Sequence, residues 1–139
     1  MTAIQPTHSI LHQAVLFADI CGSTSLYDQL GDDTARRLIA ACIATMSSVL
    51  PQFHGRIIKT IGDEILCTFP GPEAGLLAAC AMQKAVDGTV YEGGQQLHIR
   101  VGLHCGSFII ENNDIFGDTV NVAARIAGMA RKHQIMTSQ

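Results

Sequence analysis

The apolar residues of this 139-residue chain fall into two kinds of pattern. A short β-prone run at residues 14–18 predicts a buried strand. Between residues 35 and 50, apolar side chains recur at steps of three and one, which is the stripe of an amphipathic helix. Residues 97–104 alternate apolar and polar side chains, as a half-buried strand does. The chain therefore mixes helices and strands.

Turn residues separate these patterns. Gly31 divides the first helical stretch, and Gly62–Asp63 joins two extended segments, 56–61 and 65–69, into a predicted hairpin. The further elements we expect are a helix over 73–86 with Leu77 inward, a strand over 107–110, a helix from 118 to about 132 with Met129 inward, and a last strand from 134. The order β-α-α-β-β-α-β-β-α-β predicts an α+β fold: a ferredoxin-like, mainly antiparallel sheet with helices packed on it.

Composition narrows the class of protein. The chain is 47% hydrophobic and 15% charged, with a net charge of −3 and no basic stripe, so we expect no nucleic-acid partner. No apolar run reaches the ~20 residues of a membrane span. The five cysteines are odd in number and have no CxxC spacing, which argues against a disulfide framework or a zinc ribbon. We expect a single cytoplasmic domain over residues 1–139.

Two acidic residues stand at the ends of predicted strands. Asp19 follows the first strand, and Asp63 lies at the hairpin tip. Either residue alone is more simply interpreted as a turn or helix cap. If the two strands are neighbours, however, both carboxylates emerge at one end of the sheet, where they suit a hard cation such as Mg²⁺. Glu64 is expected to point away from Asp63, because alternate strand residues face opposite sides.

Two further segments carry polar groups suited to a nucleotide. Residues 21–25 form a glycine-containing loop before a helix, which offers backbone N–H groups to a phosphate but also fits an ordinary strand–helix turn. Asn121 and Arg125 are four residues apart and share a helix face. That face suits a phosphate and a sugar hydroxyl, or else it is a solvated polar face.

Four stretches in this order resemble the class III nucleotidyl cyclase catalytic domain, the family of bacterial and mammalian adenylate and guanylate cyclases. The resemblance covers the chain from about Val15 to its end. The matching stretches are Phe17-Ala18-Asp19-Ile20-Cys21-Gly22-Ser23-Thr24, Ile58-Lys59-Thr60-Ile61-Gly62-Asp63-Glu64, Gly102-Leu103-His104-Cys105-Gly106, and Phe116-Gly117-Asp118-Thr119-Val120-Asn121-Val122-Ala123-Ala124-Arg125.

The resemblance implies a metal and phosphate site. Asp19 and Asp63, helped by the Ile20 carbonyl, would bind two Mg²⁺ or Mn²⁺ ions. The β- and γ-phosphates would be held by the loop residues Cys21, Gly22, Ser23 and Thr24.

The resemblance also implies the reaction and the assembly. Lys59 and Asp114 would recognise adenine, Asn121 would orient the ribose, and Arg125 would stabilise charge on the α-phosphate. The expected activity is conversion of ATP to 3′,5′-cyclic AMP and pyrophosphate by in-line attack of the ribose 3′-hydroxyl. The family places the two aspartates on one protomer and the other four residues on its partner, so we expect a homodimer with two sites at the interface.

Two departures leave alternatives open. Only residues 107–113 lie between the Gly106 stretch and Asp114, whereas family members often have a longer hairpin there. The family domain usually continues past the strand at 135–137 and carries a phosphate-contacting lysine there, so we expect a C-terminally short cyclase domain. A non-catalytic dimerising or nucleotide-binding module on the same scaffold is the alternative. A diguanylate cyclase, a cousin in fold, is a third hypothesis, although Ile61-Gly62-Asp63-Glu64-Ile65 matches its signature turn only in part.

Overall fold

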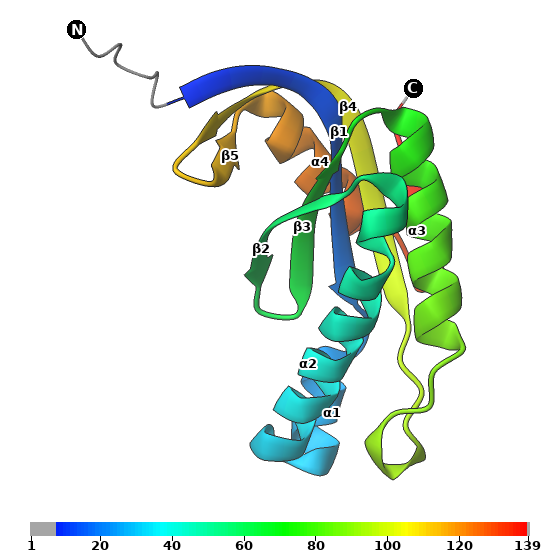
Figure 1. Ribbon diagram of the computed structural model, residues 1–139. Helices are drawn as coiled ribbons and strands as arrows, with labels where there is room; N and C mark the ends of the chain where they lie inside the picture. Colours follow the sequence, from blue (N-terminus) through cyan, green and yellow to red (C-terminus); the bar gives the residue numbers. More distant parts are fainter. Residues whose placement is uncertain (1–7, 139) are drawn as a thin grey trace, which may run out of the picture.

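A computed structural model describes residues 8–138 (Figure 1). The strands are β1 His8–Ile20, β2 Arg56–Ile61, β3 Glu64–Phe69, β4 Ile99–Glu111, β5 Asp114–Phe116 and β6 Ile135–Thr137. The α-helices are α1 Ser23–Leu30, α2 Asp32–Ser48, α3 Pro72–Asp87 and α4 Asp118–Met129, with short 3₁₀ turns η1 Leu50–Phe53 and η2 Glu92–Gly94.

The strands form one sheet in the order β2-β3-β1-β4-β5. Its centre is the long antiparallel pairing of β1 with β4, which runs from His8 opposite Glu111 to Ile20 opposite Ile99. Only β6, which pairs with the first part of β4, lies parallel to its neighbour among the described pairings. The prediction of an α+β fold with a mainly antiparallel sheet is confirmed.

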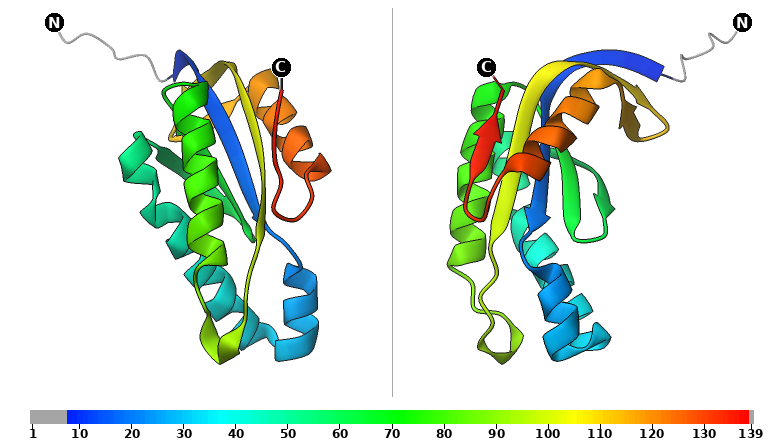
Figure 2. Two further views of the ribbon diagram at one scale, coloured as in Figure 1. Left: turned by 90° about the vertical axis from the view of Figure 1, so that its right-hand side faces the viewer. Right: turned by 180° about the vertical axis from the view of Figure 1, so that it is seen from behind.

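Helices cover the two faces of the sheet unequally. The alternation of side chains along β1 sends Leu16 and Ala18 to one face, where α2 and α3 pack, and Val15 and Phe17 to the other, where α4 packs. Figure 2 shows α3 and α4 on opposite sides of the β1–β4 pair. Since α4 packs mainly on β4 and β1, it leaves the same face of β2 exposed, where Lys59 and Ile61 lie.

The second hairpin differs from the prediction. Residues 107–110 are not a separate strand but the continuation of β4, and the chain turns only at Asn112–Asn113. Both asparagines have left-handed backbones, with φ of 52° and 63°, which is the geometry of a tight two-residue hairpin. Gly106 lies within β4 rather than in a turn. Thr119 of α4 packs so closely against it that a Cβ atom at position 106 would be 2.5 Å from the Thr119 hydroxyl oxygen.

Strand and helix limits also differ from the expectation. The predicted strand over 14–18 is the middle of β1, and α4 ends at Met129 rather than near Lys132. Met129 and Leu77 were expected inward, yet they are 62% and 51% exposed. Because α3 and α4 carry small apolar residues on more than one side, the true inner faces are lined by Ala78, Ala79, Ala123 and Ala127.

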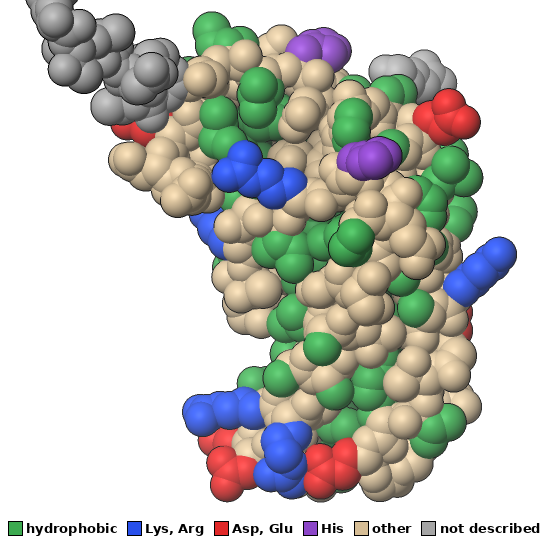
Figure 3. Space-filling model, in the orientation of Figure 1, with side chains coloured by type: hydrophobic (Ala, Val, Ile, Leu, Met, Phe, Trp, Pro, Cys, Tyr) green, Lys and Arg blue, Asp and Glu red, His purple; other side chains and the backbone are tan. Residues whose placement is uncertain are grey.

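Charged side chains are concentrated near the junction of α1 and α2 on the face drawn in Figure 3. Arg37 of α2 donates two hydrogen bonds of 3.0 Å to the Glu92 carboxylate there. Both partners are more than half exposed, so this ion pair contributes little to stability. Among the described residues, no helix combines the length and the apolar character needed to cross a bilayer.

Candidate active site

Asp19 and Asp63 meet at one end of the sheet. Asp19 is the penultimate residue of β1, and Asp63 lies in the turn between β2 and β3, of which β3 is the neighbour of β1 in the sheet. The Ile20 amide donates a 3.1 Å hydrogen bond to the Asp63 carbonyl, which ties the turn to the end of β1. Asp19, Ile20 and Asp63 line one cavity of about 470 Å³, which we call the aspartate cavity. The fold therefore brings the two carboxylates to one end of the sheet, as the sequence predicts.

The phosphate-loop candidates border the same cavity. Cys21, Gly22, Ser23 and Thr24 all line it. Gly22 has a left-handed backbone with φ of 74°, a conformation that suits glycine and lets α1 begin at Ser23, directly after the strand. The Ser23 hydroxyl donates a hydrogen bond to Oδ2 of Asp63. The first N–H groups of a helix have no partner within it, so this wall offers donors to an anion.

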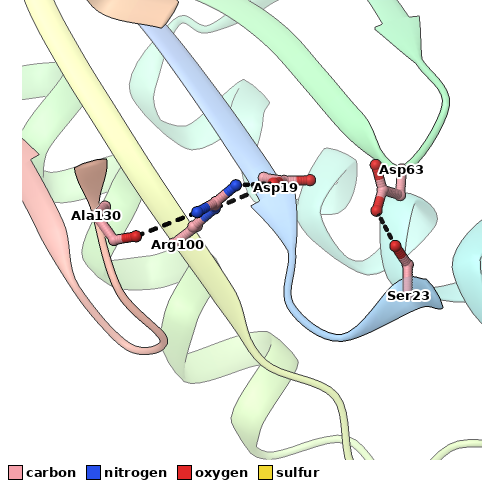
Figure 4. Close-up of polar contacts among 5 residues, drawn as sticks. All are labelled: Asp19, Ser23, Asp63, Arg100 and Ala130. Carbon is pink, nitrogen blue, oxygen red and sulfur yellow. Dashed lines mark hydrogen bonds and ion pairs between the residues drawn. The ribbon is translucent and has the colours of Figure 1, made fainter. Parts of the chain in front are cut away.

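Arg100 holds Asp19 from the neighbouring strand. It lies directly opposite Asp19 in the β1–β4 register and donates to Oδ2 from Nε at 3.1 Å and from Nη2 at 2.8 Å. A further Arg100 nitrogen donates to the Ala130 carbonyl at the end of α4 (Figure 4). Arg100 therefore connects the candidate site to the C-terminal end of α4.

Burial and like charge act against ionisation of the carboxylates. The pKa of Asp19 is raised, first by burial and then by the charge of Asp63, while the Arg100 hydrogen bond opposes the rise. The pKa of Glu64 is raised by burial and by the charges of Asp19 and Asp63. Glu64, which we expect to point away from Asp63, does not line the cavity, but it lies directly opposite Asp19, so these two side chains leave the same face of the sheet.

Three cations border this cavity. Arg100, Arg131 and Lys132 line it beside the two aspartates. Sequence reasoning missed all three, because Arg100 sits at a polar position of an alternating strand and the other two were assigned to a helix end. The signal that could have found Arg100 is its place opposite Asp19, which only the strand register provides. Together the three cationic side chains make one wall of the cavity suited to a ligand with negatively charged oxygens.

Lys59 and Asp114 contact each other but lie outside the cavity. Lys59 of β2 donates a 2.9 Å hydrogen bond to Oδ2 of Asp114 at the start of β5. The Ile115 amide donates to Oδ1 at 2.8 Å, and these two bonds, the lysine's first, lower the pKa of Asp114. The pair that was assigned to the base is thus formed within one chain.

Asn121 and Arg125 share the exposed side of α4. Neither lines the cavity that holds Asp19 and Asp63. The candidate residues therefore form separate groups within one chain: the carboxylate and phosphate-loop group, the Lys59–Asp114 pair, and the α4 face.

The donor set at Asp19 and Asp63 fits a divalent metal ion. Two carboxylates are held near each other, and burial and the charge of Asp63 both raise the pKa of Asp19. Arg100 donates to Oδ2 of Asp19 only, and Figure 4 shows the other oxygen on the side of Asp63. Carboxylate and carbonyl oxygens are the ligands that Mg²⁺ and Mn²⁺ prefer.

Comparison with known proteins assigns the family. Residues 6–139 match the model of the adenylate and guanylate cyclase catalytic domain. The chain belongs to this family. An adenylate cyclase of Streptomyces coelicolor is 32% identical over 127 residues, which cover 88% of this chain and 31% of that protein. This cyclase domain thus spans about a third of the length of that curated relative.

Solved structures agree with the fold. An adenylate/guanylate cyclase/hydrolase from Silicibacter pomeroyi matches with a TM-score of 0.81 and 29% identity, over 95% of this chain and 78% of that one. The catalytic core of a rhodopsin-guanylyl cyclase with converted specificity, in complex with ATPαS, matches with a TM-score of 0.88 and 20% identity, over 94% and 79% of the two chains.

Proposed function

We propose that this cyclase domain converts ATP to 3′,5′-cyclic AMP and pyrophosphate. The observation that carries the proposal is the single cavity in which two carboxylates, the residue 21–24 loop and three cations converge. Two Mg²⁺ or Mn²⁺ ions held by Asp19, Asp63 and the Ile20 carbonyl would lower the pKa of the ribose 3′-hydroxyl and neutralise the leaving group.

The chain's own residues position the triphosphate. The loop N–H groups and the start of α1 face the β- and γ-phosphates, and Arg100, Arg131 and Lys132 add positive charge on the opposite wall. The 3′-oxygen forms a bond to the α-phosphorus and loses its proton to water. The bond from that phosphorus to the bridging oxygen breaks, and pyrophosphate leaves with the electron pair. Positioning and electrostatics suffice for such a transfer, and no covalent protein intermediate is needed.

The Lys59–Asp114 pair supplies adenine selectivity in this proposal. Adenine presents an amino group as donor, whereas guanine presents a carbonyl oxygen at the equivalent position. The Asp114 carboxylate accepts from the amino group but repels a carbonyl oxygen. Because the Lys59 hydrogen bond lowers the Asp114 pKa, the carboxylate is ionised at neutral pH and the distinction is retained.

The complete site needs two chains. Asn121 would orient the ribose and Arg125 would stabilise charge at the α-phosphate, yet both lie on α4 outside the aspartate cavity. The open part of the sheet supports a partner there. Lys59 and Ile61 leave β2 on the same side as Leu66 and Glu64, their register partners, and the Lys59 side chain is 43% exposed. A homodimer with a two-fold axis would place α4 of each chain toward the other's cavity.

The direct test is cyclic nucleotide formation by the purified chain in Mn²⁺ with ATP or GTP. We expect cyclic AMP from ATP and a loss of at least about a hundredfold in kcat for Asp19→Asn and Asp63→Asn, since each variant removes a ligand of the reaction's metal ions. Asp28→Asn, at an exposed position of α1, is the matched control and retains activity.

Other outcomes distinguish the alternatives. Metal-dependent nucleotide binding without product would support the non-catalytic module. Cyclic GMP as the main product would contradict the proposed role of Lys59 and Asp114, and a dinucleotide made from GTP would contradict the reaction itself.

A further inference from the structure

Asp87, His98 and His133 converge outside the candidate active site. Asp87 is the last residue of α3, His98 directly precedes β4, and His133 lies in the turn between α4 and β6. Each offers one ligand atom, and these atoms all lie within 4.8 Å of one another. Nδ1 of His98 is 2.9 Å from Oδ1 of Asp87, and Nδ1 of His133 is 3.3 Å from Oδ2. None of the three residues lines the aspartate cavity.

The backbone fixes this cluster before any ligand binds. The His133 amide donates a 3.0 Å hydrogen bond to the Ile99 carbonyl, and the His98 carbonyl accepts one of 2.9 Å from the Cys21 amide. His133 has a left-handed backbone with φ of 65°, a conformation that is unfavourable for a residue with a side chain. The turn between α4 and β6 holds His133 in this conformation, and the centroids of the His133 and His98 rings lie 4.3 Å apart.

Two imidazoles and one carboxylate are a typical zinc donor set. Three protein ligands leave a fourth position for water, and the side chains are 23%, 40% and 47% exposed for His98, Asp87 and His133, so an ion and a water molecule can reach them. The two imidazoles contact different oxygens of Asp87, at 2.9 and 3.3 Å, so the carboxylate already lies between the two histidines. Mg²⁺ prefers oxygen ligands, so it would select Asp19 and Asp63 instead.

We propose that Asp87, His98 and His133 bind one Zn²⁺ ion. Bound there, the ion joins the end of α3, the start of β4 and the turn after α4. That turn also carries Arg131 and Lys132 of the aspartate cavity, and the His98 carbonyl holds the Cys21 amide of the phosphate loop. Zinc binding would therefore stiffen two walls of the cavity from outside it.

The test is a calorimetric titration of Zn²⁺ in excess Mg²⁺, which is added to compete for the carboxylate site of the proposed function. Cys80→Ser serves as the background, because Cys80 is the exposed thiol. We expect one zinc ion per chain, an affinity at least about tenfold weaker in His133→Asn and Asp87→Asn, and no change in His12→Gln. Asparagine tolerates the left-handed backbone at position 133, and His12 is an exposed histidine on β1.

Thermal unfolding gives a second readout. Zinc should raise the Tm of the background protein and of His12→Gln but not of either cluster variant. Should His133→Asn not fold, Asp87→Asn at its exposed helix end still decides the question. Absence of zinc binding in the background protein, or equal affinity in the cluster variants, would overturn the proposal and would show that the three side chains form a hydrogen-bonded group only.

Discussion

Glu64, Asp19 and Arg100 form a row across three neighbouring strands. Asp19 is directly opposite Glu64 on β3 and directly opposite Arg100 on β4. With Asp63 in the adjacent turn, three carboxylates lie near one another at this end of the sheet. Arg100 donates hydrogen bonds to Asp19. In the absence of metal, this arrangement stores repulsion that a divalent ion would relieve.

Glu64→Gln should stabilise the metal-free domain at neutral pH. The folded-state pKa of Glu64 is raised, so the folded protein binds the proton more tightly than the unfolded one. The stabilisation that protonated Glu64 gives to the folded state is therefore complete below the usual glutamate pKa. It is lost as the pH rises through the raised pKa of the folded protein. We expect a gain of a few tenths to about 1 kcal/mol at neutral pH that shrinks in acid.

The measurement is thermal unfolding across pH, without metal and with excess Mg²⁺. Glu111→Gln is the control, because Glu111 lies at the other end of β4. A bound ion should cancel or reverse the gain, since the carboxylate then faces a positive charge. A wild-type protein that is more stable than Glu64→Gln without metal at neutral pH would contradict the repulsion.

Asp114→Asn should reduce discrimination between nucleotides. An amide can turn either its oxygen or its nitrogen toward the base, so the variant accepts guanine as well as adenine. We expect the ratio of kcat/KM for ATP to that for GTP to fall by about tenfold or more. Asp118→Asn, an exposed acid at the start of α4, is the comparison variant, and an equal fall there would rule out a specific role for Asp114.

The sequence revealed the acidic half of the candidate site but not its basic half. Asp19 and Asp63 stand where apolar strands end, which is a visible position in a sequence pattern. Arg100 looks like any solvent-facing residue of an alternating strand until the register places it opposite Asp19. Lys132 reaches the cavity because α4 ends at Met129, a limit that depends on tertiary contacts such as the Arg100 bond to the Ala130 carbonyl.

The contact between α4 and β4 depends on glycine at two points along the strand. A Cβ atom at Gly102 would lie 2.5 Å from the Ala127 Cα atom, and one at Gly106 would meet Thr119. These glycines allow the helix backbone to rest on the strand. The sequence shows both residues within a recognisable motif, but it predicts Gly106 between two strands, 97–104 and 107–110, because a pattern alone does not separate a close helix approach from a turn.

Gly102→Ala should destabilise the fold by about 1–3 kcal/mol, because the methyl group meets helix backbone rather than a movable side chain. Gly128→Ala is the matched control on α4, where an added Cβ meets nothing within 4 Å. Gly128→Ala should raise the free energy of unfolding by a few tenths to about 1 kcal/mol, because alanine has a higher helix propensity than glycine. Urea unfolding midpoints of the two variants measure both effects, and equal stabilities would contradict the close packing.

At the scale of the whole molecule, one chain holds both halves of the proposed site but keeps them apart. The aspartate cavity is lined by the last residues of β1, the strand that ends in the lower half of Figure 1. The helix α4 packs on β4 and β1, and its residues Asn121 and Arg125 are exposed. Most of the elements could be predicted from the hydrophobic pattern, because strands and helices have different periods. The exception is β5, since the expected strand over 107–110 is part of β4. Which faces remain open for a second chain could not, because that depends on how far α4 extends across the sheet.

Mixing two inactive variants should therefore restore activity. Asp63→Asn damages the aspartate cavity and Arg125→Ala damages the α4 face, so each homodimer has two defective sites. In a mixed dimer, one site receives both damaged halves and the other receives both intact halves. Random pairing of equal amounts makes half of the dimers mixed, which predicts about a quarter of wild-type cyclic AMP formation, against almost none for either variant alone. A mixture of Asp63→Asn with Asp19→Asn is the control and stays inactive, because both changes fall in the same half. If the first mixture also stays inactive while both variants are folded and dimeric, the two halves do not meet across an interface.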